Sequence, residues 1–189
     1  MTPIKLVILD RDGTINQDSD DFIKTADEWM PLPGALEAIA RLNQAGWHTV
    51  VASNQSGLGR GLFEVSDLNA IHAKMHQMLA AVGGRIDAVF YCPHTPVEGC
   101  HCRKPATGLL EQIEGRYGFD LKNVPMVGDS ARDVIAGVAV GCEPHLVLTG
   151  KGAVYKGRKL PETFPVDTRV HEDLAAFVDF LLAREEERG

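Results

Sequence analysis

Two carboxylates, Asp10 and Asp12, stand two residues apart directly behind the apolar run 4–9, and Gly13 and Thr14 follow them. The run predicts a buried strand, which would place both carboxylates at the edge of a parallel sheet where ligands bind. One carboxylate can attack a substrate while the other manages the proton of the leaving group. Asp-Gly is also common in ordinary β-turns, so an acidic turn is the alternative interpretation.

Ser53 and Lys104 repeat this placement further along the chain. Ser53 follows the apolar stretch 47–52, where a hydroxyl and nearby backbone N–H groups can hold phosphoryl oxygens. Lys104 would neutralise negative charge on a phosphoryl group and on the attacking carboxylate. Taken alone, Ser53 is also compatible with an ordinary polar loop, and a lone lysine is normally a surface residue, so the interpretation of Lys104 depends on its neighbours.

Two more carboxylates, Asp129 and Asp133, follow the apolar stretch 124–127. Mg²⁺ prefers oxygen ligands and is typically held by one or two carboxylates together with substrate phosphate. Asp129 suits a direct ligand, whereas Asp133 suits a contact through water or a supporting role. Asp also caps helices well, and both roles are compatible at a helix start.

Strands and helices alternate along the whole chain, which predicts βαβ units and a parallel sheet covered on both faces. The expected strands are 4–9, 47–52, 86–91, 124–127 and 145–148. The expected helices are 34–45, 66–82 with Ser66 as N-cap, 108–117 with Gly118 as C-cap, 131–138 and 172–184. The segment from Gly150 to Arg169 is expected to be a solvated surface loop, although its basic residues could instead face a phosphate; these are Lys151, Lys156, Arg158 and Lys159.

The 189 residues suggest one domain, 1–189, and the 44% hydrophobic content allows a proper core. A net charge of −7 argues against nucleic acid or an anionic membrane as partner. The chain has neither a long apolar stretch nor a signal-peptide pattern, so we expect a cytoplasmic protein, and a monomer.

Three cysteines and two histidines lie in the segment 92–102. In a reducing compartment such a cluster is more often a metal site than a disulfide framework. Cys92, His94, Cys100 and Cys102 form a set suited to a structural, tetrahedral Zn²⁺. His101 is the competing imidazole, but the thiols on both sides of it would crowd the site. A reduced loop without metal is the alternative.

In this order and on this pattern, the Asp-x-Asp-Gly-Thr motif, the strand-end Ser, the Lys-Pro and the Gly-Asp-x-x-x-Asp resemble the haloacid dehalogenase (HAD) superfamily. The resemblance implies that Asp10 attacks phosphorus and that Asp12 protonates the leaving alcohol and later deprotonates water. It implies that Ser53 and Lys104 bind the phosphoryl group. It also implies that Asp10, the backbone carbonyl of Asp12, and Asp129 hold Mg²⁺.

The expected architecture is therefore an α/β, three-layer Rossmann-like fold with a mostly parallel sheet. The segment between the first two motifs leaves no room for a cap domain. Selectivity must then come from short loops, at 18–29, 57–63 and the zinc loop 92–102.

The zinc loop before Arg-Lys-Pro resembles one branch, which holds the D-glycero-D-manno-heptose 1,7-bisphosphate 7-phosphatases and the histidinol-phosphate phosphatases. The segment 54–63 is similar to the heptose enzymes, which implies a sugar bisphosphate as substrate and a role in making activated heptose for surface polysaccharide. Asn54 and Gln55 are then expected to bind substrate. Arg60 and Arg103 can bind a second phosphate bidentately or contact sugar hydroxyls. Histidinol phosphate is the alternative substrate.

Overall fold

The computed structural model describes residues 4–187, so the ends of the expected domain, 1–3 and 188–189, lie outside the described residues. Six strands form one parallel sheet in the order β3-β2-β1-β4-β5-β6. The strands are β1 (Leu6–Leu9), β2 (His48–Asn54), β3 (Ala88–Cys92), β4 (Pro125–Gly128), β5 (Glu143–Val147) and β6 (Arg169–His171).

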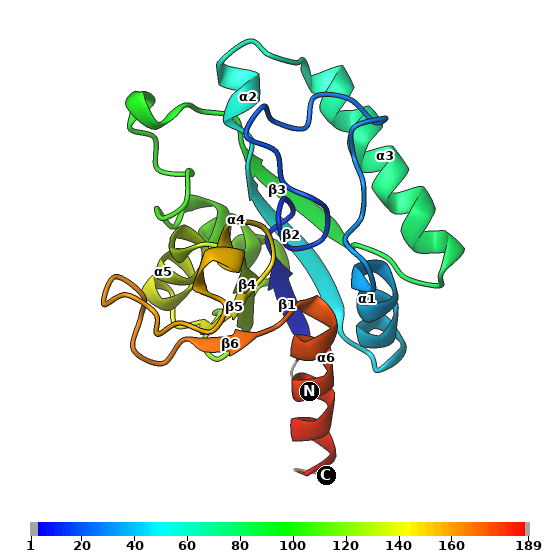
Figure 1. Cartoon of the computed structure of the whole chain (residues 1–189), viewed down its shortest axis with the longest axis vertical. Coiled ribbons are helices and arrows are strands. Elements are labelled where there is room, and N and C mark those ends of the chain that lie inside the picture. Colours follow the sequence, from blue (N-terminus) through cyan, green and yellow to red (C-terminus); the bar gives the residue numbers. More distant parts are fainter. Residues whose placement is uncertain (1–3, 188–189) are drawn as a thin grey trace.

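Helices cover both faces of this sheet, which confirms the predicted three-layer α/β architecture (Figure 1). The α-helices are α1 (Ala35–Gln44), α2 (Ser56–Gly59), α3 (Val65–Ala81), α4 (Gly108–Tyr117), α5 (Ala131–Ala139) and α6 (Leu174–Glu186), and the 3₁₀ helices are η1 (Pro96–Glu98) and η2 (Gly150–Tyr155).

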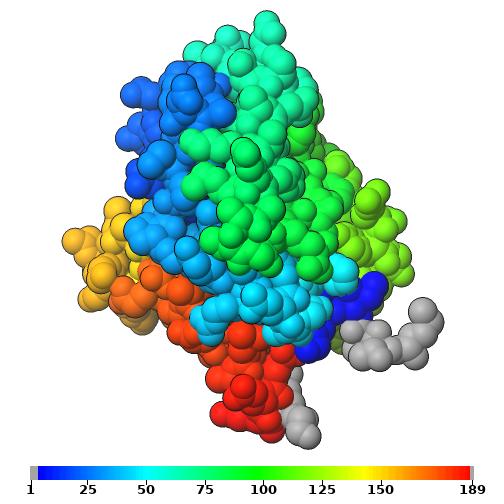
Figure 2. All heavy atoms as spheres, turned by 90° about the vertical axis from the view of Figure 1, so that its right-hand side faces the viewer, coloured from blue at the N-terminus to red at the C-terminus, as the bar shows by residue number. Residues whose placement is uncertain are grey.

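Successive residues of β1 face opposite sides of the sheet, as the pleat requires. Val7 and Leu9 belong to the core under α1, α3 and α6, whereas Leu6 and Ile8 belong to the core under α4 and α5. In Figure 2 the face with α1 and α3 is toward the viewer, and α6, in red, extends below them. Burial on both faces explains why the central strands are apolar throughout.

The position of β1 decides where the chemistry lies. It pairs with β2 on one side and with β4 on the other, with Leu9 opposite Val51 and Val127. The parallel strands therefore bring their carboxyl ends, and the loops that follow them, to one edge of the sheet.

The expected elements are all present, with ends shifted by a few residues. One cap was wrong: the N-cap of α3 is Glu64, which forms a reciprocal capping box with Asp67, and Ser66 lies inside the helix. Gly118, with φ of 74°, is the C-cap of α4 as predicted.

The prediction of a plain solvated loop between Gly150 and Arg169 was incomplete. This segment contains η2 and begins β6, and it buries Phe164 against Val134 and Leu146. Such short elements have no periodicity of their own and depend on the packing of distant residues. Among residues 4–187, no helix is both long and apolar enough to cross a membrane.

Candidate active site

A pocket opens at the carboxyl edge of the sheet, between the loops that follow β1, β2, β3, β4 and β5. Its lining residues are Asp10, Asp12, Asp18, Ser19, Asp20, Phe22, Ile23, Asn54, Gln55, Ser56, Arg60, Arg103, Lys104, Asp129, Arg132, Asp133 and Lys151. Except for Ser53, every active-site residue predicted outside the cysteine cluster lies on this list.

Lys104 is fully buried at the centre of the site, between two carboxylates. Its Nζ donates to Oδ1 of Asp10 at 3.0 Å, to Oδ1 of Asp133 at 2.7 Å and to the carbonyl oxygen of Ala52. Burial alone would lower the pKa of Lys104, but Asp10 and Asp133 raise it above its usual value. All three N–H donors are occupied, so a phosphoryl oxygen would have to replace one of these acceptors.

Asp10 follows β1, and its backbone N–H donates to the carbonyl of Val127 at 2.9 Å, which fixes its position at the sheet edge. Burial, and then the nearby Asp133, raise the pKa of Asp10 to about 6, while Lys104 opposes the shift. The carboxylate is therefore mostly ionised near neutral pH and remains available as a nucleophile.

Asp129 lies in space that two glycines leave open. A Cβ on Gly13 would come within 2.0 Å of Asp129 Oδ2, and a Cβ on Gly150 within 2.3 Å. The same oxygen accepts the backbone N–H of Lys151 at 2.8 Å. Burial and the charges of Asp10 and Asp133 raise the pKa of Asp129 to about 9.

Mg²⁺ fits this arrangement. One ligand atom from each of Asp10, Asp129 and Asp133 lies within 4.8 Å of the others. Three buried carboxylates with one lysine among them leave uncompensated negative charge, which a hard cation with oxygen ligands would balance. Asp133 is itself held by the backbone N–H and the hydroxyl of Ser130, both at 3.1 Å, as part of a capping box.

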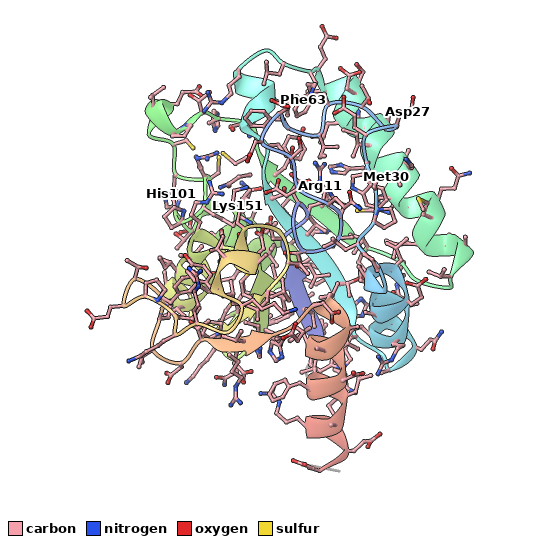
Figure 3. The ribbon with its side chains drawn as sticks, in the orientation of Figure 1. Arg11, Asp27, Met30, Phe63, His101 and Lys151 are labelled. Atoms are coloured by element: carbon pink, nitrogen blue, oxygen red, sulfur yellow. The ribbon has the colours of Figure 1, made fainter. Side chains whose placement is uncertain are left out.

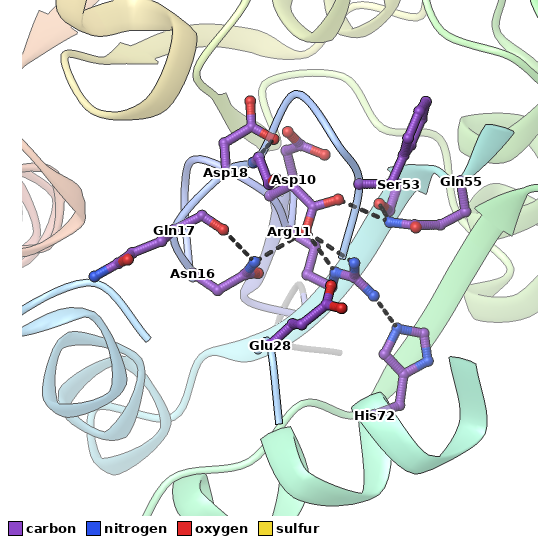
Figure 4. A network of polar contacts seen from close by, with 12 residues as sticks. Asp10, Arg11, Asn16, Gln17, Asp18, Glu28, Ser53, Gln55 and His72 are labelled. Atoms are coloured by element: carbon purple, nitrogen blue, oxygen red, sulfur yellow. Dashed lines mark hydrogen bonds and ion pairs between the residues drawn. The ribbon is translucent and has the colours of Figure 1, made fainter. Parts of the chain in front are cut away.

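Asp12 is held by donors on both carboxylate oxygens, which come from Arg11, Asn16 and Gln55, all labelled in Figure 4. Its Oδ1 accepts from Nε of Arg11 at 2.9 Å and from Nδ2 of Asn16 at 2.9 Å, and it forms an ion pair with Nη2 of Arg11 at 2.8 Å. Its Oδ2 accepts from Nε2 of Gln55 at 3.0 Å. Burial would raise the pKa of Asp12, but Arg11 and these hydrogen bonds outweigh burial and lower it.

The segment after β2 supports the other groups. Gln55 Nε2 also donates to Oγ of Ser53 at 2.8 Å, which links Ser53 to Asp12. Asn54 exchanges two hydrogen bonds, each of 3.0 Å, with the backbone of Lys104. Both amides line the pocket as expected, but in this structure they position catalytic candidates.

The outer part of the pocket carries a group of guanidinium ions, Arg60, Arg103 and Arg132. Arg103 Nη1 is buried and has no hydrogen-bond partner among residues 4–187. Burial lowers the pKa of Arg103, and the charges of Arg132 and Arg60 lower it further. Mutually repelling cations with an unpaired buried donor form a site that an anion would stabilise.

Two pocket residues had no firm assignment from the sequence. Arg132 lies in the Gly-Asp motif, but nothing in its spacing distinguishes it from a surface arginine on α5. Lys151, labelled in Figure 3, pairs with Asp18 across the pocket. Of the four basic residues between Gly150 and Arg169, only Lys151 lines this pocket, because the start of η2 packs against Asp129.

The predicted cysteine cluster also comes together. Sγ of Cys102 lies 2.9 Å from Sγ of Cys92 and 3.2 Å from Nδ1 of His94. One ligand atom each from Cys92, His94, Cys100 and Cys102 lies within 4.8 Å of the others, and the cysteines are not in disulfides. The competing imidazole, His101, instead contacts Oε2 of Glu111 at 2.8 Å in an exposed position. This donor set fits a structural zinc ion.

Comparison with known proteins gives consistent results. A family model described as "HAD-hyrolase-like" matches residues 101–177. Two relatives named D-glycero-beta-D-manno-heptose-1,7-bisphosphate 7-phosphatase are similar over almost their full lengths. The relative from Bordetella bronchiseptica is 56% identical over 95% of this chain and 98% of its own. The relative from Pseudomonas aeruginosa is 52% identical over 94% of this chain and 97% of its own.

Solved structures show the same likeness. The crystal structure of D,D-heptose 1,7-bisphosphate phosphatase from B. bronchiseptica, complexed with magnesium and phosphate, has a TM-score of 0.91 at 55% identity, covering 96% of this chain and 99% of that chain. The enzyme of the same name from Burkholderia thailandensis has a TM-score of 0.74 at 50% identity, and the match covers 95% of this chain and 99% of that chain.

Proposed function

This chain belongs to the D-glycero-beta-D-manno-heptose-1,7-bisphosphate 7-phosphatase family of HAD-like hydrolases, and on that basis we propose that it removes the 7-phosphate of that sugar bisphosphate. The product would serve the synthesis of nucleotide-activated heptose for surface polysaccharide. The observation that carries the proposal is the pocket itself, in which a buried Asp10–Lys104–Asp133 group lies beside a cluster of arginines.

In the first step, an Asp10 carboxylate oxygen attacks phosphorus and the bond from phosphorus to the sugar oxygen breaks. The leaving alkoxide takes a proton from Asp12. The donors around Asp12 lower its pKa, whereas the negative charge of a bound phosphate dianion favours the protonated form that this step needs. Lys104 and Ser53 bind the phosphoryl oxygens in this proposal.

In the second step, Asp12 takes a proton from water as the water oxygen attacks phosphorus. The bond between phosphorus and Asp10 breaks, which releases inorganic phosphate and restores both carboxyl groups. Splitting hydrolysis through an acyl phosphate replaces one difficult step by two easier ones. The lowered pKa of Asp12 suits it to the start of this second step, when it must be an anion.

A Mg²⁺ ion held by Asp10, Asp129 and the backbone carbonyl of Asp12 would supply positive charge that offsets the repulsion between Asp10 and the phosphate dianion. Asp133 supports this group by fixing Lys104. The B. bronchiseptica relative was crystallised with magnesium and phosphate, which supports the same cofactor here. In the cysteine cluster we propose a structural Zn²⁺ whose role is to present Arg103 and Lys104, directly after Cys102.

We propose that Arg60, Arg103 and Arg132 receive the non-reacting phosphate of the substrate. Bidentate guanidinium–phosphate contacts would satisfy the buried Nη1 of Arg103. Histidinol phosphate presents an amine and an imidazole at its distal end, which the same arginines would repel. The charge of the outer pocket therefore favours the sugar bisphosphate, and the names of the relatives favour its beta anomer.

The test is phosphate release by the purified protein with Mg²⁺ from both anomers of the heptose 1,7-bisphosphate and from histidinol phosphate. We expect the highest kcat/KM for the beta anomer. A preference for the alpha anomer would overturn only the anomer assignment. A preference for histidinol phosphate would reject the proposed substrate and would place the enzyme in amino-acid synthesis.

We further propose that the enzyme acts as a monomer with one domain, because Asp10, Lys104 and Asp129, which carry the proposed chemistry, meet at one edge of a single sheet. The four cysteines are free, which is compatible with a reducing compartment such as the cytoplasm. Size-exclusion chromatography with light scattering would test the monomer, and a dimer that forms part of the pocket would reject it.

A further inference from the structure

Arg11, between the two motif carboxylates, is a fully buried cation with contacts on two sides. Toward the pocket, its Nε donates to Oδ1 of Asp12, and its Nη2 lies within ion-pair distance of the same oxygen. On the other side, its Nη1 lies 3.1 Å from Nε2 of His72, which comes from α3 (Figure 4). The guanidinium is thus clamped between a helix on the sheet face and the proposed acid–base residue.

The direction of the Arg11–His72 hydrogen bond follows from chemistry. A guanidinium can only donate, so Nε2 of His72 must accept, and the ring must be neutral with its proton on Nδ1. Burial, together with the charge of Arg11, lowers the pKa of His72 to about 4, which agrees with a neutral ring. Nη2 of Arg11 already has no hydrogen-bond partner among residues 4–187, so removing the acceptor would leave a second buried nitrogen of this guanidinium, Nη1, without a partner.

The contact with Arg11 also distinguishes the two carboxylate oxygens of Asp12. Oδ1 accepts two N–H groups, one from Nε of Arg11 and one from Asn16, and it also lies 2.8 Å from Nη2 of Arg11 in an ion pair, whereas Oδ2 accepts only one N–H group, from Gln55. Oδ2 lies on the same side as Ser53, since Gln55 Nε2 donates to both. Oδ2 is therefore the oxygen with capacity left for a proton.

We propose that His72 is a positioning residue for proton transfer: through Arg11 it fixes Oδ1 of Asp12 and so presents Oδ2 to the leaving-group oxygen. This inference rests on the proposed role of Asp12 in a phosphatase reaction, although not on the identity of the sugar. His72 itself touches neither substrate nor the reacting atoms. A helix remote from the motif loops thereby contributes to the chemistry.

The test compares esters that need the proton with one that does not. The alkoxide released from an alkyl phosphate is a poor leaving group and needs a proton from an acid. The p-nitrophenolate released from p-nitrophenyl phosphate leaves without that help. The parameter kcat/KM reports the steps up to release of the leaving group, so later hydrolysis does not enter. His72→Leu removes the acceptor, and His72→Gln restores an amide oxygen near the position of Nε2. His76→Leu, at an exposed position one turn further along α3, is the matched control.

For His72→Leu we expect kcat/KM on the heptose bisphosphate to fall on the order of tenfold, part of the ~100- to 10,000-fold that a positioned acid–base group contributes. We expect less than about a twofold change with p-nitrophenyl phosphate, and recovery in His72→Gln. Equal losses on both esters, no loss on the alkyl ester, or no recovery in His72→Gln would each overturn the proposal.

A second variant and a second substrate complete the experiment. If His72→Leu does not fold, His72→Asn replaces it, because its shorter amide cannot reach Arg11 as Nε2 does. Fructose 1,6-bisphosphate, also an alkyl ester of a primary alcohol, serves as a second substrate. Should the wild type hydrolyse it but not the heptose bisphosphate, the proposed substrate fails while the role of His72 is still tested.

Discussion

Gly13 and Asp129 occupy adjoining space at the centre of the site: a Cβ on Gly13 would lie 2.0 Å from Oδ2 of Asp129. Gly13 also has a φ of 81°, in the left-handed region that favours glycine. One residue therefore serves both the turn of the first motif and the placement of the carboxylate that directly follows β4, more than a hundred positions away in sequence.

Gly13→Ala should displace Asp129 and lower kcat by roughly 100-fold, the effect expected of about 1 Å of misplacement. Gly46→Ala is the matched control, because Gly46 has a φ of 85° and nothing within 4 Å of its Cβ position. Both variants should lose about 1–2 kcal/mol of stability in urea unfolding from backbone strain. Equal kcat values in the two variants would contradict the role of the close approach.

Asp10→Asn should reduce turnover by roughly 1,000-fold or more, because it removes the proposed nucleophile. The fold should persist with unchanged or higher thermal stability, since one of three repelling carboxylates is removed. Phosphate release and circular dichroism measure the two effects, and Asp27→Asn, at an exposed position, is the control. Substantial residual turnover would rule out a covalent intermediate on Asp10.

Arg103→Ala should lower kcat/KM for the bisphosphate by about 10- to 100-fold, the effect expected from losing hydrogen bonds to a charged group. With p-nitrophenyl phosphate, which has no second phosphate, the loss should be much smaller. Arg116→Ala, on the exposed side of α4, should change neither value. If steady-state kinetics showed the same fold-decrease in kcat/KM for both substrates, the assignment of Arg103 to the second phosphate would be contradicted.

Cys102→Ser should lower both the melting temperature and the zinc content, which we expect near one equivalent in the wild type. Activity should fall as well, because Lys104 lies two residues beyond. Elemental analysis and thermal unfolding check these outcomes. Cys142→Ala, at a buried cysteine outside the cluster, should keep its zinc. A wild type without zinc would reject the structural metal.

Two histidines in contact, the buried His145 and the half-buried His171, should contribute a loss of stability as the solution is acidified. His145 Nδ1 lies 3.0 Å from Nε2 of His171, at the contact of β5 with β6. Burial, and then His171, lower the pKa of His145 to about 3, while burial and Arg169 lower the pKa of His171 to about 4. In the unfolded chain both would titrate near 6.5, so below that pH the unfolded state binds more protons.

The contribution of these two histidines to the urea midpoint should therefore be steady above pH 6.5 and should decline between pH 6.5 and about 4. The raised pKa values of Asp10 and Asp129 act in the opposite direction, so the contribution is measured as the difference between the wild type and a histidine variant. His171→Gln should weaken this decline, whereas His101→Gln, at an exposed ring, should not. The same pH dependence in the wild type and in His171→Gln would show that the histidine pair does not control acid stability.

Much of the fold and site was predictable because the signals are local. The apolar run 4–9 ending in Asp10 indicates a buried strand with chemistry at its end, and Cys92, Cys100 and Cys102 indicate a metal site by composition and spacing. Backbone periodicity and residue type determine such features, so they are readable without coordinates.

Other features depended on which distant residues meet. Nothing in the sequence pairs His72 with Arg11, directs Lys151 rather than Lys156 into the pocket, or distinguishes Arg132 from a surface arginine. The sequence by itself determined the order of strands and helices and the chemical groups at their ends. Only the tertiary structure decided their partners, because a partner follows from three-dimensional packing, which brings together residues that local patterns treat as unrelated.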